Sequence, residues 1–117
     1  MSVLAGLVVV IVALLHIGFL VLEMFLWTRP IGLKIFSQGD AEFADRSKAL
    51  GKNMGLYNGF LAAGLLWFLA QGLIDVVVFF LLCVVVAGVY GSLTANPRIL
   101  WVQAAPAVLA LLLILIS

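Results

Sequence analysis

Four runs of apolar residues, each about 20 residues long, most constrain what this chain can fold into. They cover approximately residues 3–27, 49–70, 75–93 and 98–116. About 20 helical residues, rising 1.5 Å each, cross the roughly 30 Å hydrocarbon core of a bilayer. The chain is 67% hydrophobic and 9% charged, whereas soluble domains are about half apolar and a quarter charged. The sequence therefore predicts an integral membrane protein, with residues 1–117 in a single membrane domain.

The four runs predict helices rather than a β-barrel. Barrel strands alternate in hydropathy over about ten residues, whereas stretches such as DVVVFFLLCVVVAGVYG are continuously apolar. The second and third connections, QGLID and TANPR, are short, so the helices that they join are antiparallel neighbours. The expected fold is an all-α, antiparallel up-down bundle of four transmembrane helices.

The basic residues are distributed asymmetrically among the connections. All six lie in or beside the first and third connections: Arg29, Lys34, Arg46, Lys48, Lys52 and Arg98. By the positive-inside rule, loops 28–48 and 94–98 are expected in the cytoplasm and both termini outside, as in a bacterial inner membrane. These residues form neither a long run nor a stripe interleaved with aromatics, which argues against a nucleic-acid partner.

The first connection is long enough to carry structure of its own. Asp40 is placed to cap a helix that runs through AEFADRSKAL directly into the second span. Before it, PIGLKIF has the pattern of a segment lying on the bilayer surface, with Lys34 toward water and Ile35 and Phe36 toward lipid. The alternative is a solvated linker.

Every predicted span contributes a polar side chain at a similar depth near the cytoplasmic side. On the first span, His16 and Glu23 are seven residues apart and share a face, which Trp27 continues. On the second span Asn53 is level with Glu23, and Asn58 lies roughly 7 Å deeper, toward the depth of His16. Tyr90 of the third span and Gln103 of the fourth complete this predicted layer.

Glu23 is the strongest candidate for a functional residue. A charged group at the bilayer centre costs about 2.5 kcal/mol or more, so Glu23 should face the bundle interior and have a partner. We expect Glu23 and His16 to be catalytic, with Glu23 as proton donor or acceptor. The alternatives are a Glu23 that pairs with the basic loop and a His16 that only joins helices through a hydrogen bond. No second histidine or nearby cysteine supports a metal site, and the sequence indicates no particular cofactor.

The second span has a face of small residues and a polar face. Gly51, Gly55 and Gly59 form a stripe that allows another helix to approach closely, and we expect a homo-oligomer through them. Asn53 and Tyr57 fall on the opposite side. This segregation favours a lined cavity over polar groups that merely hold helices together.

Two further features are expected to be structural. Trp27, Trp67 and Trp101 lie near span ends, where tryptophans typically occupy the membrane interface. Pro106 predicts a kink or a point of tight packing in the fourth span.

The stretches HIGFLVLEMFLWTRPIGLKIF and SKALGKNMGLYNGFLAAGL resemble the small integral membrane proteins of the DUF1304 family. The residues that carry the likeness are His16, Glu23, Met24, Trp27, Asn53 and the run LYNGF at 56–60. The resemblance covers essentially the whole chain. It implies a four-span membrane protein and leaves its activity open.

A second likeness is to the membrane-associated eicosanoid and glutathione metabolism proteins. Asp45, Arg46, Asn53 and Tyr57 match the spacing of polar residues at the start of their second helix, whereas Ala49 and Leu56 stand where an arginine and a glutamate are expected. The resemblance implies a ligand site between subunits at the cytoplasmic end. The two departures argue against glutathione.

The sequence thus favours a protein that binds, and as a further step modifies, a lipophilic small molecule or membrane lipid in a polar pocket at the cytoplasmic end of the bundle. Its expected ligand-binding residues are Asn53, Tyr57, Asn58, Tyr90, Gln103 and Arg46. Two alternatives stay open: a proton-coupled small-molecule transporter, and a non-catalytic accessory subunit of a membrane complex.

Overall fold

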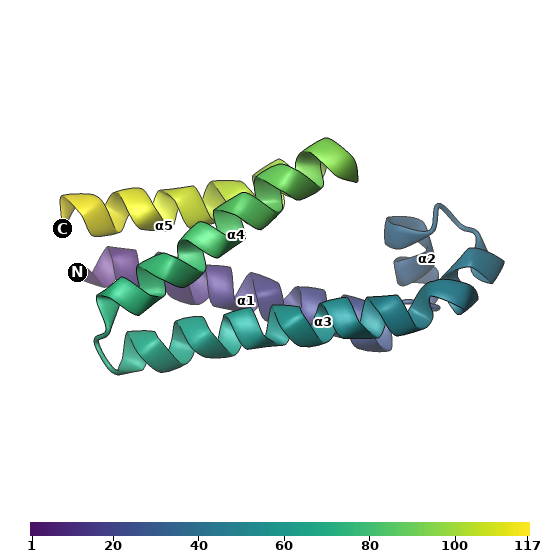
Figure 1. Ribbon diagram of the computed structural model, residues 1–117, viewed down its shortest axis with the longest axis horizontal. Coiled ribbons are helices and arrows are strands. Elements are labelled where there is room, and N and C mark those ends of the chain that lie inside the picture. The colour runs from purple at the N-terminus through teal and green to yellow at the C-terminus, as the bar shows by residue number, and fades with distance from the viewer. The chain divides into compact units, whose positions relative to one another are not determined.

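The computed structural model describes residues 1–117, which form helices joined by turns, with no strand (Figure 1). The helices are α1 (Val3–Phe25), α2 (Pro30–Phe36), α3 (Ala41–Ala70), α4 (Ile74–Thr94), the π-helical turn η1 (Leu100–Ala104) and α5 (Ala105–Ile116). All four apolar runs are helical, so the prediction of an all-α fold is confirmed.

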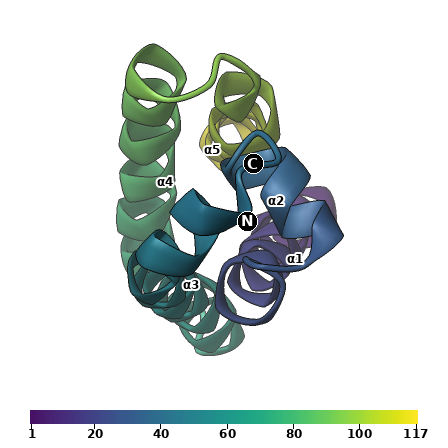
Figure 2. The same ribbon diagram turned by 90° about the vertical axis from the view of Figure 1, so that its right-hand side faces the viewer.

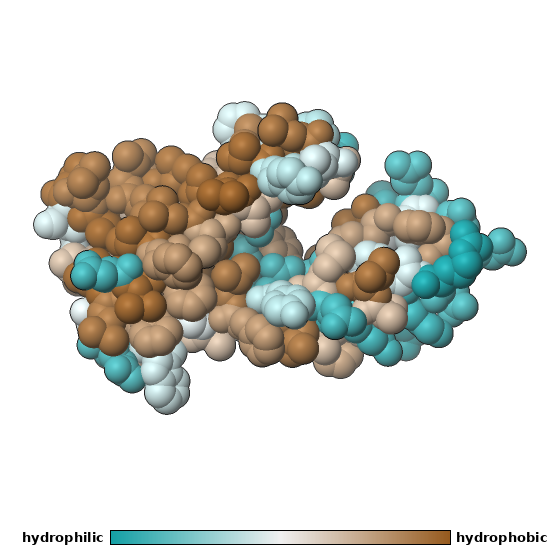
Figure 3. All heavy atoms as spheres, viewed as in Figure 1, coloured by the Kyte–Doolittle hydropathy of each residue, from teal (hydrophilic) through white to brown (hydrophobic).

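Two helices, α1 and α4, are long and apolar enough to cross a membrane, judged by length and composition. The apolar helical segment Leu100–Ile116 is shorter. The second predicted span, 49–70, lies within α3, which also includes the charged residues of AEFADRSK at its start. The space-filling view shows hydrophobic residues over the parts formed by α4 and α5, and hydrophilic ones around α2 and the first turns of α3 (Figure 3).

The chain divides into two compact units. Residues 1–15 and 61–117 form the core unit, and residues 16–60 form the loop unit. The helices α1 and α3 each contribute residues to both units.

The core unit is held together by aliphatic and small side chains from α1, α3, α4 and α5. Its fully buried members include Val9, Val12, Leu65, Val77, Leu81, Val84, Ala107 and Ala110. Small residues allow close approach: a Cβ on Gly88 of α4 would lie 2.8 Å from the Cβ of Ala104. Adding even one methyl group at such a contact would force the two segments apart.

The π-helical turn η1 ends two residues before Pro106. Proline has no backbone N–H and its ring crowds the preceding turn, so the regular pattern of hydrogen bonds is interrupted there. In the structure the N–H of Ala105 donates to the carbonyl of Leu100, five residues earlier. The irregularity expected at Pro106 thus takes the form of a widened helical turn.

The loop unit contains the two helical segments of the first connection. Asp40 accepts a hydrogen bond from the N–H of Phe43 through Oδ1 at 3.1 Å, which caps the first turn of α3. The chain then remains helical from Ala41 to Ala70. The predicted cap and the continuous helix into the second apolar run are therefore confirmed. The segment PIGLKIF is also helical, as α2, but Phe36 stacks on Trp27 instead of facing lipid as expected.

Candidate functional site

In the loop unit α1 and α3 pack closely along the glycine face of α3. A Cβ built on Gly59 would lie 2.6 Å from Leu20, one on Gly55 would lie 2.5 Å from Met24, and one on Gly51 would lie 2.5 Å from the Trp27 ring. As the residue number rises by four along α3, the number of the contacted residue on the first segment falls by three or four. The two segments are therefore antiparallel.

The glycine stripe is therefore occupied within the chain. We expected Gly51, Gly55 and Gly59 to admit a helix from a second copy, but Gly55 and Gly59 contact α1 of the same chain and Gly51 contacts Trp27, just after it. These distances leave no room for another helix on this face. The expected contact surface is corrected accordingly, while self-association itself stays a prediction.

Glu23 faces this helix contact and is 4% exposed. Nδ2 of Asn58, on α3, donates a hydrogen bond to Oε1 of Glu23 at 2.5 Å. Gly55 allows the approach, because its missing Cβ would lie 3.2 Å from the Cβ of Glu23. A buried carboxyl and an amide from different helices thus meet in an apolar surrounding, where each stabilises the other's burial.

His16 is fully buried on α1, seven residues before Glu23. Its ring packs edge-on against Phe19, with the ring centroids 5.1 Å apart and an interplanar angle of 69°. The position of His16 on the buried side of α1 agrees with the shared face that the spacing predicted.

The other polar residues predicted on α3 lie on exposed surface. Asn53 donates from Nδ2 to the carbonyl of Ala49 in its own helix, at 2.8 Å. Tyr57 is 64% exposed and meets Phe60 edge-on, while the exposed Arg46 forms an ion pair with Glu42 at 3.8 Å. Of the candidate ligand-binding residues on α3, Asn58 is the one that meets Glu23.

Tyr90 and Gln103 belong to the core unit. Tyr90 is 69% exposed and lies at one end of a shallow apolar groove along α4, whose other lining residues are Phe79, Leu82, Cys83, Val86 and Ala87. Gln103 is half-buried in the π-helical turn η1. No group of three or more His, Cys, Asp or Glu side chains in residues 1–117 is placed to hold a metal ion.

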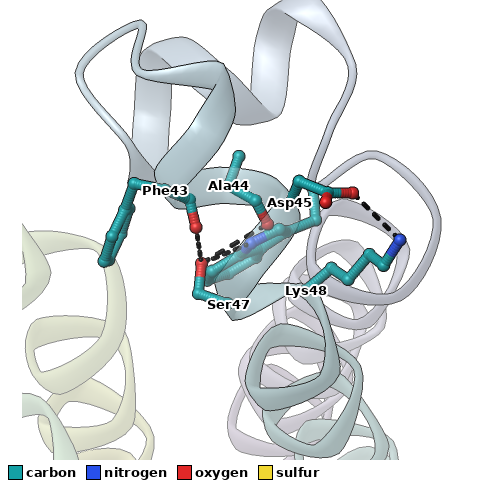
Figure 4. Close-up of polar contacts among 6 residues, drawn as sticks. Phe43, Ala44, Asp45, Ser47 and Lys48 are labelled. Carbon is teal, nitrogen blue, oxygen red and sulfur yellow. Dashed lines mark hydrogen bonds and ion pairs between the residues drawn. The ribbon is translucent and has the colours of Figure 1, made fainter.

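A second cluster of the loop unit centres on Trp27 and corrects the expectation of an interfacial tryptophan there. Trp27 is 8% exposed, and its Nε1 donates to Oγ of Ser47 at 3.1 Å. The Ser47 hydroxyl in turn donates to the carbonyl of Phe43 at 2.7 Å (Figure 4). Phe36 of α2 stacks on the Trp27 ring, with the ring centroids 4.5 Å apart. Trp67 and Trp101 are exposed, at 65% and 73%.

Ser47 was not predicted from the sequence, although a signal for it was present. Ser47 lies four residues before Gly51, so it extends the stripe of small residues by one turn toward the start of α3. Extending the glycine stripe by one turn would have placed the Ser47 hydroxyl opposite Trp27.

Comparison with known proteins gives two findings. A family model described as Protein of unknown function (DUF1304) matches residues 10–115. The chain is also 31% identical over 115 residues to the uncharacterised protein YpaA of Lactococcus lactis subsp. lactis (strain IL1403), covering 96% of this chain and 97% of that protein. No solved structure gives a significant match.

Proposed function

The chain belongs to the DUF1304 family, as the resemblance of its sequence predicted, and we propose that it binds a lipophilic small molecule or lipid at the Glu23–Asn58 pair. The observation that carries the proposal is the burial of Glu23 against an amide from another helix. Ionisable groups in membrane-spanning helices are rare and costly, and they commonly mark substrate or ion sites.

The chemistry of the pair suits a ligand with a polar group on a lipophilic body. Asn58 bonds one oxygen of the Glu23 carboxyl group, Oε1. A carboxyl group has a second oxygen that accepts a hydrogen bond when ionised and donates one when protonated. In our proposal this oxygen meets the hydroxyl, amine or carbonyl of the ligand, and Asn58 fixes the orientation of the carboxyl. Leu20 and Met24 make the surroundings of the pair apolar, which suits the lipophilic part of such a ligand.

Modification of the bound molecule is the further step of this proposal. Glu23 would act as proton donor or acceptor, because a positioned carboxyl group is a suitable acid or base. His16 shares the buried side of α1 and would orient the substrate. We propose no cofactor.

The test is a search for a co-purified lipophile. Protein extracted in a mild detergent is analysed by mass spectrometry, and we expect one lipid class or small molecule at least tenfold enriched over the bulk membrane extract. Glu23→Gln should abolish the enrichment, whereas Glu42→Gln, at an exposed carboxylate of α3, should retain it. The absence of any enriched species in several detergents, or equal enrichment in Glu23→Gln, would overturn the proposal.

We propose further that the chain crosses the membrane four times, in a bacterial inner membrane, with both termini outside. Support comes from the four apolar helical stretches and from the confinement of Lys and Arg to loops 28–48 and 94–98 and residues beside them. Reporter enzymes that are active on one side only, fused at residues 40, 72, 96 and 117, test this topology. We expect cytoplasmic activity at 40 and 96 and external activity at 72 and 117.

A further inference from the structure

The short helix α2 has two different faces. Its inner face is held by Trp27: Phe36 stacks on the Trp27 ring, with an interplanar angle of 16°, and Gly32 is buried. A Cβ on Gly32 would lie 2.6 Å from the carbonyl oxygen of Trp27, so only glycine fits there. The outer face presents Ile31 and Ile35, four residues apart, which are 50% and 49% exposed.

The position of α2 is restricted by the chain. The helix α1 ends at Phe25 and α2 begins at Pro30, so residues 26–29 join them. Four residues span at most about 14 Å even when fully extended. The views in Figures 1 and 2 agree that α2 runs across the direction of α1 rather than along it. A helix so placed at the end of a membrane-crossing helix lies along the membrane surface.

Both charged residues within 24–39, the segment that contains α2, are basic, and Asp40, Glu42 and Asp45 lie at the start of the next helix. Arg29 precedes the helix and Lys34 lies on it, and both are exposed. No acidic residue occurs between Glu23 and Asp40. Basic residues at a membrane surface are attracted to anionic lipid headgroups, and aliphatic residues on the same short helix enter the boundary with the acyl chains.

We propose that α2 is an interfacial helix that binds an anionic lipid surface. Ile31 and Ile35 enter the acyl boundary of the leaflet, and Arg29 and Lys34 contact lipid phosphates. The stack of Phe36 on Trp27 fixes which face of α2 is turned to the lipid. This inference rests on the proposed membrane topology, but it does not depend on a ligand at Glu23.

The test measures the depth of individual side chains in proteoliposomes of phosphatidylcholine and phosphatidylglycerol. Spin labels are attached to single cysteines in a Cys83→Ala background: Ile31→Cys, Ile35→Cys, Lys34→Cys and, on α1, Leu14→Cys. Collision with oxygen, which is concentrated in lipid, is compared with collision with a water-soluble nickel chelate. We expect labels at 31 and 35 to favour oxygen severalfold and the label at 34 to favour nickel.

The label at position 14 separates the two proposals. Leu14 is 56% exposed in the middle of α1, so it should be the most oxygen-accessible site if α1 crosses the bilayer. If position 14 favours oxygen while 31 and 35 favour nickel as strongly as 34, the topology stands and the interfacial helix is overturned. If position 14 also favours nickel, both proposals fail.

A second arm tests the charge. Replacing phosphatidylglycerol by phosphatidylcholine, or combining Arg29→Gln with Lys34→Gln, should lower the oxygen preference of the label at 35 at least twofold. The label at 14 should not change. An oxygen preference at 35 that is independent of both lipid charge and these residues would overturn the role assigned to anionic lipid.

Discussion

Asn58 and Glu23 are 35 residues apart in the chain, and a hydrogen bond from Nδ2 of Asn58 to Oε1 of Glu23 joins α3 to α1 at 2.5 Å. The bond lies beside Gly55, so the close helix approach and the polar contact occur at the same level. A buried carboxyl without a partner is unfavourable in an apolar surrounding. This pair therefore contributes to the stability of the helix contact as well as to the proposed ligand site.

Asn58→Leu should destabilise the protein, because it leaves the Glu23 carboxyl without its amide donor. Hydrogen bonds between membrane helices contribute about 0.6 kcal/mol on average and up to about 1.7 kcal/mol. We expect a coupling energy in this range from a double-mutant cycle that combines Asn58→Leu with Glu23→Leu. The measurement is the free energy of unfolding by dodecyl sulfate in mixed micelles, followed by circular dichroism.

Asn53→Leu is the matched control for this cycle. The side-chain amide of Asn53 bonds to Ala49 in its own helix and does not link helices. Its coupling with Glu23→Leu should be close to zero. A coupling at Asn58 no larger than that at Asn53 would show that the hydrogen bond does not stabilise the helix pair.

Gly51→Ala should destabilise the protein although alanine is the better helix former. Alanine gains about 0.5–1 kcal/mol over glycine inside a helix. At this position, however, the new methyl group would lie 2.5 Å from two carbons of the Trp27 ring, and overpacking typically costs about 1–3 kcal/mol. We expect a net loss of about 1 kcal/mol in the same unfolding assay.

Gly18→Ala provides the comparison, because a Cβ on Gly18 would meet no atom within 4 Å. This variant should be neutral or more stable by about 0.5–1 kcal/mol, the helix propensity difference alone. Equal effects at positions 18 and 51 would contradict the close packing of α3 on Trp27.

Much of the fold follows from the sequence because helix formation in apolar runs depends on local periodicity and length. The Asp40 cap and the continuous helix from Ala41 to Ala70 were predicted from short-range signals and are present. The π-helical turn before Pro106 has a local cause too, although a sequence indicates only that regularity is lost there and not how. The proposed four-span topology, in contrast, depends on the bilayer as well as on the chain.

The candidate site was only partly predictable. Helical periodicity tells which residues share a face of a helix, but it does not tell which other helix packs against that face. Depth along the helices placed Asn53 level with Glu23 and Asn58 deeper, toward His16, whereas the structure joins Asn58 to Glu23. Helical spacing grouped Asn53 and Tyr57 into a cavity lining, yet both are exposed on α3. The small residues of α3 were likewise assigned to a second copy, because nothing in the sequence says that α1 covers them.

Asp40→Ala should loosen the first turn of α3. The Asp40 carboxylate accepts the N–H of Phe43, and loss of an N-cap of this type costs about 1 kcal/mol. Hydrogen exchange at the Phe43 amide should therefore accelerate about fivefold, since 1.4 kcal/mol corresponds to a factor of ten. Asp45→Ala removes only an exposed ion pair with Lys48 and should change this rate little. Unchanged exchange in Asp40→Ala would show that the cap does not stabilise the helix start.

Ser47→Ala should be more destabilising than its small change in volume suggests. The Ser47 hydroxyl accepts the hydrogen bond from Nε1 of the buried Trp27, at 3.1 Å. Removing the acceptor leaves this indole N–H without a partner, and an unsatisfied buried donor costs about 1–3 kcal/mol. The unfolding assay in mixed micelles should show a loss in that range. The substitution should also weaken the stacking of Phe36, on α2, against Trp27.

Two comparisons separate the lost hydrogen bond from a general effect of alanine. The hydroxyl of Ser92 donates to Val89 at 2.7 Å within its own helix and receives no such indole donor, so Ser92→Ala should be neutral or slightly stabilising. In a Trp27→Phe background, where the indole donor is absent, Ser47→Ala should cost at least 1 kcal/mol less than in the unmodified protein. If the serine substitution is equally costly in both backgrounds, Ser47 acts through its own bond to Phe43 and not through Trp27.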